Sequence, residues 1–169
     1  NGGLFLFDEI DGSNPQAVTA FNQAIENGEM TFPCGVVKAH KDFKVIAAAN
    51  TNGTGATNQY KRNALCGATL DRFSRIELHY DLDLEVRLAI AEYQRIAGND
   101  APLAPAHAFI SKVQTARRVA AEKRIDVIIS PRSSIRGCGI LAMGDTVKMA
   151  INECFGASLS VDQLKQLGL

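Results

Sequence analysis

The sequence lacks the closely spaced residue pairs from which small metal sites and disulfide frameworks are built. Its four cysteines are spread along 169 residues without a CxxC pair, and its three histidines are equally scattered. Structural zinc sites need ligands at short spacings, and disulfide scaffolds need a dense set of cysteines in a short secreted chain. The pattern therefore argues against both and favours reduced thiols in a cytoplasmic protein.

The sequence also has no excess of positive or negative charge. Lys and Arg number 18, Asp and Glu number 18, and the formal net charge is zero. Binding of nucleic acid through bulk positive charge is therefore not indicated, although a local basic patch is compatible with a zero net charge. No apolar run approaches the roughly 18 residues of a membrane-spanning helix, so we expect no membrane partner.

The first part of the chain has the pattern of an α/β domain. The apolar run Leu4–Phe7 ends in acidic residues and predicts a buried strand of a parallel sheet, and KVIAAAN predicts a second strand that ends at Asn50. Between them, Asn14 and Pro15 predict the start of a helix over about residues 16–26, and EMTFPCGVV predicts a hairpin. After a polar loop rich in Gly, Asn and Thr, SRIELHY predicts a third strand.

The later part of the chain has the pattern of helices only. Apolar residues at helical spacing predict helices over 84–96 and 104–123, and Ser130 followed by Pro131 predicts the cap and first residue of a third helix. Further helices are predicted around 145–154 and 161–167. We therefore expect two domains, a strand-containing one over residues 1–81 and an all-helical one over 82–169.

Polar residues follow two of the predicted strands. Asp8 and Glu9 end the first, and Asn50 ends the second. Because ligands of open parallel sheets bind at the carboxyl ends of the strands, these residues are candidates for a magnesium–phosphate site, with one acid near the metal and the other polarising an attacking water. The alternative is a pair of acids that caps the next turn, and the residues alone do not decide. Asp11 is expected to be a local turn or cap residue.

The order of the motifs resembles that of the AAA+ ATPases, most closely their helix-2-insert branch, which includes the MoxR-type, cobalt-chelatase-type and dynein-related proteins. A strand ending in FLFDEID is followed by VIAAANT, then LDRF, then SPR at the start of a late helix. In that family these motifs are Walker B, sensor 1, the arginine finger and sensor 2. The resemblance implies an α/β P-loop NTPase core with a parallel sheet, followed by a helical lid.

The resemblance also implies a role for each matching residue. Asp8 would hold Mg²⁺, and Glu9 would activate the water that attacks the γ-phosphate of ATP. Asn50 would position that water or contact the γ-phosphate. Arg72 would reach into the site of a neighbouring subunit, and Arg132 would contact the phosphates, either in its own subunit or in the next one.

Both arginine assignments have alternatives in the sequence. Arg72 could form a surface ion pair with Asp71, and Arg75 is a second candidate for the arginine finger. Arg132 or Arg136 could simply lie on the surface of its helix.

Two further segments lie where the helix-2-insert branch carries insertions. The hairpin EMTFPCGVV occupies the place of the pore-facing helix-2 insert, and the loop TNGTGATNQYKRN occupies that of a second insertion before the finger. Tyr60, Lys61 and Arg62 in this loop could contact a partner or nucleic acid, although an ordinary solvated loop is the simpler explanation.

One motif of the family, the phosphate-binding loop GxxxxGK[ST], is absent from the sequence. That loop cradles the phosphates with backbone N–H groups and a lysine, and nucleotide affinity depends on it. In AAA+ proteins it precedes Walker B, so the resemblance implies that the upstream half of the core lies outside this sequence and that this chain alone is inactive. Without that half, the strand ending at Asn50 would have an unpaired apolar edge.

The function implied by the resemblance is ATP hydrolysis in a ring, a hexamer, that remodels or activates a partner protein. Relatives of this type often act with a protein that has a von Willebrand factor A-like domain, in metal insertion or enzyme activation. One alternative is an assembly subunit that contributes Arg72 but hydrolyses nothing, and the intact Asp8 and Glu9 pair argues against it. The other is a DNA-directed motor of helicase or phage type, and the zero net charge argues against it.

Overall fold

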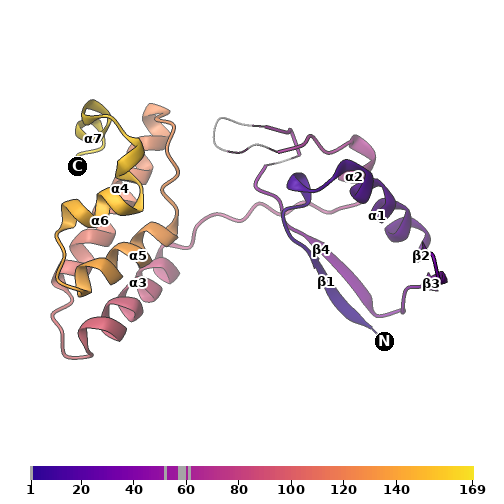
Figure 1. The fold of residues 1–169 in the computed structure, drawn as a ribbon, viewed down its shortest axis with the longest axis horizontal. Helices are drawn as coiled ribbons and strands as arrows, with labels where there is room; N and C mark the ends of the chain where they lie inside the picture. Colours follow the sequence, from indigo (N-terminus) through magenta and orange to yellow (C-terminus); the bar gives the residue numbers. More distant parts are fainter. Residues whose placement is uncertain (1, 52, 57–59, 61) are drawn as a thin grey trace. The chain divides into compact units, whose positions relative to one another are not determined.

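The structure is a computed structural model that describes residues 2–51, 53–56, 60 and 62–169. The chain divides into two compact units, Asn1–Glu77 and Leu78–Leu169, which we call the α/β unit and the helical unit. Figure 1 shows the strands in the first and α3 to α7 in the second. The protein is therefore a mixed α/β protein with a small parallel sheet.

The parallel sheet consists of β1 (Gly3–Phe7) and β4 (Phe43–Ala47). Gly3 pairs with Phe43 and Phe7 pairs with Ala47 in a parallel register, and Figure 1 shows the two strands side by side. Both strands were predicted from their short apolar runs, and their parallel pairing confirms the prediction.

Helix α1 (Pro15–Asn27) begins and ends as the sequence predicts. The side chain of Asn14 accepts a hydrogen bond of 2.8 Å from the backbone N–H of Gln16, and Pro15 occupies the first turn. Gly28 ends the helix at φ 65°, a conformation that glycine adopts at little cost. Phe21 on α1 lies 5.2 Å from the rings of both Phe5 and Phe7, measured between centroids, so α1 packs on one face of β1.

The predicted hairpin is also present. It consists of β2 (Glu29–Phe32) and β3 (Gly35–Lys38), which pair in an antiparallel register and form a sheet separate from β1 and β4.

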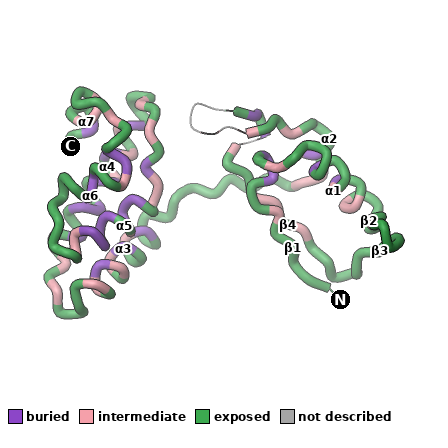
Figure 2. Tube along the Cα trace, viewed as in Figure 1, coloured by how far each residue is buried: buried purple, intermediate pink, exposed green. Residues whose placement is uncertain are grey.

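The other face of the parallel sheet is largely exposed. Leu4, Leu6 and Ile46 are 66%, 57% and 51% exposed, and Figure 2 shows exposed residues along most of β1. Parallel strands are normally covered on both faces, so this surface is unusual for a parallel sheet.

The prediction of a third strand in SRIELHY is wrong. Residues 74–81 pair with no described strand, and Ile76 and Leu78 are 82% and 89% exposed. An apolar–polar alternation becomes a strand only where a neighbouring backbone accepts and donates its hydrogen bonds, and no described segment does so here. The short helix α2 (Gly67–Asp71), which precedes this segment, was not predicted as a separate element.

The helical unit confirms the predicted helices. It contains α3 (Leu82–Ala97), α4 (Ala104–Lys123), α5 (Pro131–Ala142), α6 (Val147–Cys154) and α7 (Val161–Gln166). Short 3-10 turns are present at Ile10–Gly12 and Gly156–Ser158. Among the described residues, no helix is both long enough and apolar enough to cross a membrane.

Phe109 is at the centre of the helical unit's core and packs directly against α5. It is 1% exposed and belongs to a cluster of buried side chains from α3, α4, α5 and α6. A Cβ atom at Gly137 would lie 2.2 Å from its ring, so only glycine permits this close approach of α5 to α4.

Candidate functional site

The carboxyl ends of β1 and β4 lie at the same edge of the parallel sheet. Beyond the last strand pair, the N–H of Ala48 donates to the carbonyl of Phe7 and the N–H of Ile10 donates to the carbonyl of Ala48, both at 3.0 Å. Asp8 and Glu9 therefore lie in the turn between these two hydrogen bonds, and Asn50 lies two residues after Ala48. All three residues are exposed, and we call them the strand-end residues.

Glu9 has a strained backbone. Its φ and ψ are 50° and 44°, in the left-handed region, and its N–H donates to Oδ1 of Asp8 at 2.9 Å. Such a conformation costs a non-glycine residue roughly 1–3 kcal/mol and is found preferentially at functional sites. In the described part of the chain, Arg124 is the only other non-glycine residue at positive φ. This strain marks Glu9 as a candidate functional residue.

Arg62 connects two acidic residues behind the strand ends. Its Nη2 lies 3.1 Å from Oε1 of Glu9, and its Nε lies 3.5 Å from Oδ1 of Asp11. It also lies beside the ring of Tyr60, 5.8 Å from the centroid. The sequence left Arg62 either as a residue of an ordinary solvated loop, the simpler explanation, or as a contact for a partner, and here it binds acids of its own unit. Lys61, considered with it, lies outside the described residues.

Asp11 is a turn residue, as predicted, with a long-range contact that was not predicted. Its side chain is completely buried, and Oδ2 accepts hydrogen bonds from the N–H and the hydroxyl of Thr51, at 3.0 and 2.9 Å. Asp11 lies in the short 3-10 turn Ile10–Gly12, as expected, and its carboxylate also binds Thr51, a residue far along the chain. Asp11 fixes the loop after β4, which includes Asn50, to the turn after β1.

The strand-end residues fit one kind of magnesium site. No group of three or more His, Cys, Asp or Glu side chains among the described residues could hold a metal ion, so a dedicated protein cage is not built there. Mg²⁺ bound to a nucleotide needs less, because it keeps several waters and takes one or two carboxylates together with phosphate oxygens. The exposed carboxylate of Asp8 meets that requirement.

Arg72 forms an ion pair with a residue that the sequence did not indicate. It follows α2, its Nε lies 2.9 Å from Oε2 of Glu26, and its Nη1 donates to the carbonyl of Ala68. The predicted alternative, a pair with Asp71, is not the one observed. The Arg72 side chain is 26% exposed and that of Glu26 is 59% exposed, so the ion pair is partly buried on the Arg72 side.

Arg132 belongs to the helical unit. It is exposed in the first turn of α5, after the predicted cap Ser130 and Pro131. Arg136, one turn later, and Arg75, the competing finger candidate, are also exposed.

Sequence reasoning missed a buried polar cluster behind α5. The side chain of Glu85 on α3 is completely buried, and its oxygens lie 2.8 and 2.7 Å from Nη1 and Nη2 of Arg117 on α4. The hydroxyl of Ser134 and the amide of Gln114 also donate to it. The guanidinium lies 5.0 Å from the ring centroid of Tyr80. We call these residues the Glu85 cluster.

The Glu85 carboxyl is ionised in this environment. Burial alone would raise its pKa, but the hydrogen bonds from Arg117 and Ser134 and the charge of Arg117 outweigh burial and hold the pKa below its usual value. The only sequence signal for the cluster is the presence of polar residues on otherwise apolar helix faces, and that signal does not say which residues pair.

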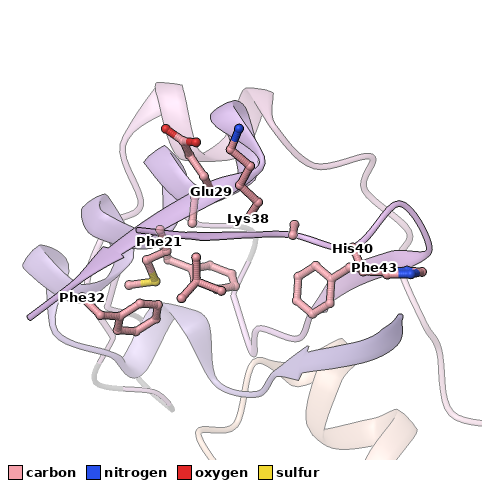
Figure 3. Close-up of a pocket in the computed structure, with 10 residues that line it drawn as sticks. Phe21, Glu29, Phe32, Lys38, His40 and Phe43 are labelled. Carbon is pink, nitrogen blue, oxygen red and sulfur yellow. The ribbon is translucent and has the colours of Figure 1, made fainter. Parts of the chain in front are cut away.

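A separate apolar groove lies beside the hairpin. It has a volume of about 540 Å³, and its lining includes Phe21, Met30, Phe32, Val37 and Phe43. Figure 3 shows the three phenylalanine rings gathered beside the hairpin, with the charged ends of Glu29 and Lys38 pointing away from them. The groove shares no lining residue with the strand-end residues.

Comparison with protein-family models gives no match, and comparison with curated proteins gives none either.

Proposed function

We propose that this chain supplies the catalytic strand ends and the helical lid of an AAA+ ATPase, a P-loop NTPase that hydrolyses ATP in a cytoplasmic ring, a hexamer, and remodels or activates a partner protein. The observation that carries the proposal is the parallel pairing of β1 and β4, which puts Asp8, Glu9 and Asn50 at one edge of a sheet. The order of these residues with Arg72 and Arg132 along the sequence supports it.

Each strand-end residue has a chemical task in this proposal. Mg²⁺, when bound, neutralises phosphate charge, and the carboxylate of Asp8 holds it through coordinated water. Glu9, in the turn after β1, accepts the proton of the attacking water once its carboxylate is released from Arg62. The amide of Asn50 donates a hydrogen bond to that water or to the γ-phosphate.

The proposal requires a phosphate-binding loop, which these 169 residues do not contain. The loop has to come from elsewhere in the polypeptide or from another subunit. We call the complete assembly that contains it the ATPase assembly, and tests of hydrolysis apply to that assembly.

Arg72 acts in the site of a neighbouring subunit in this proposal. A guanidinium brought to the transferring phosphoryl group offsets its negative charge, and such a residue can change turnover by about 10³–10⁵-fold. In this role Arg72 has to exchange the carboxylate of Glu26 for a phosphate oxygen.

Mixed assemblies test the proposal. Arg72→Ala and Glu9→Gln should each abolish ATP hydrolysis when all subunits carry the change. Mixing the two kinds of subunit should restore part of the activity, because some sites then combine an intact Glu9 with an intact Arg72 from the next subunit.

The matched control is Arg75→Ala, which removes a nearby exposed arginine and should leave hydrolysis unchanged. Full activity of the uniform Arg72→Ala assembly, or no recovery in mixed assemblies that are shown to form, would contradict a role of Arg72 between subunits.

A further inference from the structure

The Glu85 cluster holds the chain on both sides of Arg132. On one side, Nε of Arg117 donates to the carbonyl of Ile129, three residues before Arg132, at 2.5 Å. On the other side, the hydroxyl of Ser134, two residues after Arg132, donates to Oε1 of Glu85. One buried ion pair therefore fixes both the entry into α5 and its first turn.

The burial pattern of this turn sets the direction of Arg132. Ser133 and Ser134 are 7% and 0% exposed, whereas Arg132 beside them is exposed. Because residues of a helix are separated by about 100° around its axis, holding Ser134 against Glu85 fixes the rotation of the turn and with it the side from which Arg132 projects.

Stability alone is a weak explanation for such a cluster. Buried ion pairs can often be replaced by apolar residues of similar size without loss of stability, whereas in some proteins their paired geometry specifies one arrangement of the elements. Glu85 receives donors from two other helices and Arg117 also contacts Tyr80, so the cluster joins α3, α4, α5 and the segment before α3.

We propose that Glu85, Arg117 and Ser134 are positioning residues for Arg132. They keep the start of α5 in one orientation, so that the guanidinium of Arg132 is presented to a phosphate group without reordering of the helix. This inference rests on the proposed role of Arg132 as a phosphate contact, and it adds the residues through which the helical unit controls that contact.

The variant that tests the inference is Ser134→Ala. It removes one hydrogen bond to Glu85, leaves the ion pair with Arg117 in place, and introduces a good helix former, so the fold is retained. The matched control is Ser133→Ala. Ser133 is a buried serine in the same helical turn, and its hydroxyl donates to no described residue of the Glu85 cluster.

Two measurements follow the effect. Hydrogen exchange of the 169-residue chain should be faster at the amides of residues 133–136 in Ser134→Ala. In the ATPase assembly, the KM for MgATP should rise about tenfold, the lower end of what is expected for one lost hydrogen bond to a charged carboxylate, with kcat little changed. Ser133→Ala should alter neither quantity.

A double-mutant cycle separates positioning from a general structural effect. If Ser134 acts through Arg132, then Ser134→Ala should have no further effect on KM once Arg132→Ala is present. Independent, additive effects of the two changes would overturn the inference.

The remaining outcomes distinguish this inference from the proposed function. If Arg132→Ala raises KM but Ser134→Ala changes neither KM nor exchange, positioning by the cluster is refuted and the phosphate role of Arg132 stands. If Ser134→Ala speeds exchange but Arg132→Ala leaves KM unchanged, the Glu85 cluster does hold the start of α5 in place, and the phosphate role of Arg132 is refuted.

Discussion

At the scale of single residues, Asp11 determines whether the strand ends keep their arrangement. Its buried carboxylate accepts two hydrogen bonds from Thr51 and lies beside Arg62, which in turn binds Glu9. Removal of this carboxylate would take the acceptor from the N–H and hydroxyl of Thr51 and one of two acidic partners from Arg62, which is more costly than the loss of a surface ion pair.

We therefore expect Asp11→Ala to destabilise the α/β unit by about 3 kcal/mol. The measurement is hydrogen exchange at the amide of Ala48, which is bonded to Phe7 across the sheet. The control is Asp42→Ala, which removes an exposed carboxylate beside His40 in the same unit and should change exchange little. Equal effects of the two substitutions would show that Asp11 does not anchor the loop.

The residues of the candidate site differ in how far the sequence predicts them. Asp8, Glu9 and Asn50 could be assigned to one sheet edge because short apolar runs mark the strands and parallel pairing follows from their pattern. The contacts of Arg62 with Glu9 and of Arg72 with Glu26 could not, because both depend on the three-dimensional course of loops that periodicity does not encode.

At the scale of elements, α5 contains two glycines with opposite packing requirements. A Cβ atom at Gly137 would lie 2.2 Å from the ring of Phe109, whereas one at Gly139 would lie 3.4 Å from the nearest atoms of Glu92 and Ile96. The first distance is a severe overlap and the second is ordinary contact.

We expect Gly137→Ala to destabilise the helical unit by roughly 1–3 kcal/mol, because the methyl group overpacks the core. Gly139→Ala should instead stabilise it by up to about 1 kcal/mol, since alanine is the better helix former. Chemical denaturation followed by circular dichroism at 222 nm (a wavelength that reports helix) measures both. Equal effects of the two changes would contradict the packing of α5 on Phe109.

The Glu85 cluster, which joins α3, α4 and α5, predicts that the stability of the helical unit depends on pH. The folded-state pKa of Glu85 lies below its unfolded value, so its stabilising contribution is fully present above the unfolded pKa of about 4.3 and is lost as the pH falls through the folded pKa. Glu85→Gln should therefore be less stable than the unsubstituted protein at neutral pH, by about 3 kcal/mol.

This difference should shrink as the pH falls through and below the unfolded pKa. Hydrogen exchange at core amides of α3 and α4, recorded at several pH values and corrected for intrinsic exchange rates, gives the free energy of opening of both proteins. A difference that does not change with pH would contradict an ionised Glu85.

Helices and strands were predicted well where the sequence pattern that marks them lies within the element itself. The helices of the helical unit have caps and apolar spacing within their own sequence, such as the Asp81 side chain that accepts from Leu84. The segment 74–81 also has strand periodicity, but a strand needs a partner, and the described chain provides none. Local pattern thus determines helices more fully than it determines sheets.

At the scale of the whole molecule, the two units differ in how much apolar surface they bury. The main cluster of buried side chains lies entirely within residues 89–167 of the helical unit, whereas β1 and β4 have exposed leucine and isoleucine side chains. The exposed sheet face carries the strand-end residues at one edge, and in our proposal the rest of the ATPase assembly packs against it.

The most direct test of the account is ATP turnover by the ATPase assembly with Glu9→Gln, measured together with nucleotide binding. The control is Glu29→Gln, which changes an exposed glutamate on the hairpin. We predict that Glu9→Gln binds MgATP as tightly as the unsubstituted assembly and loses at least about 100-fold in turnover, because in our proposal Glu9 is the general base, while Asp8, the proposed metal ligand, remains. Turnover equal to that of Glu29→Gln would contradict the central claim.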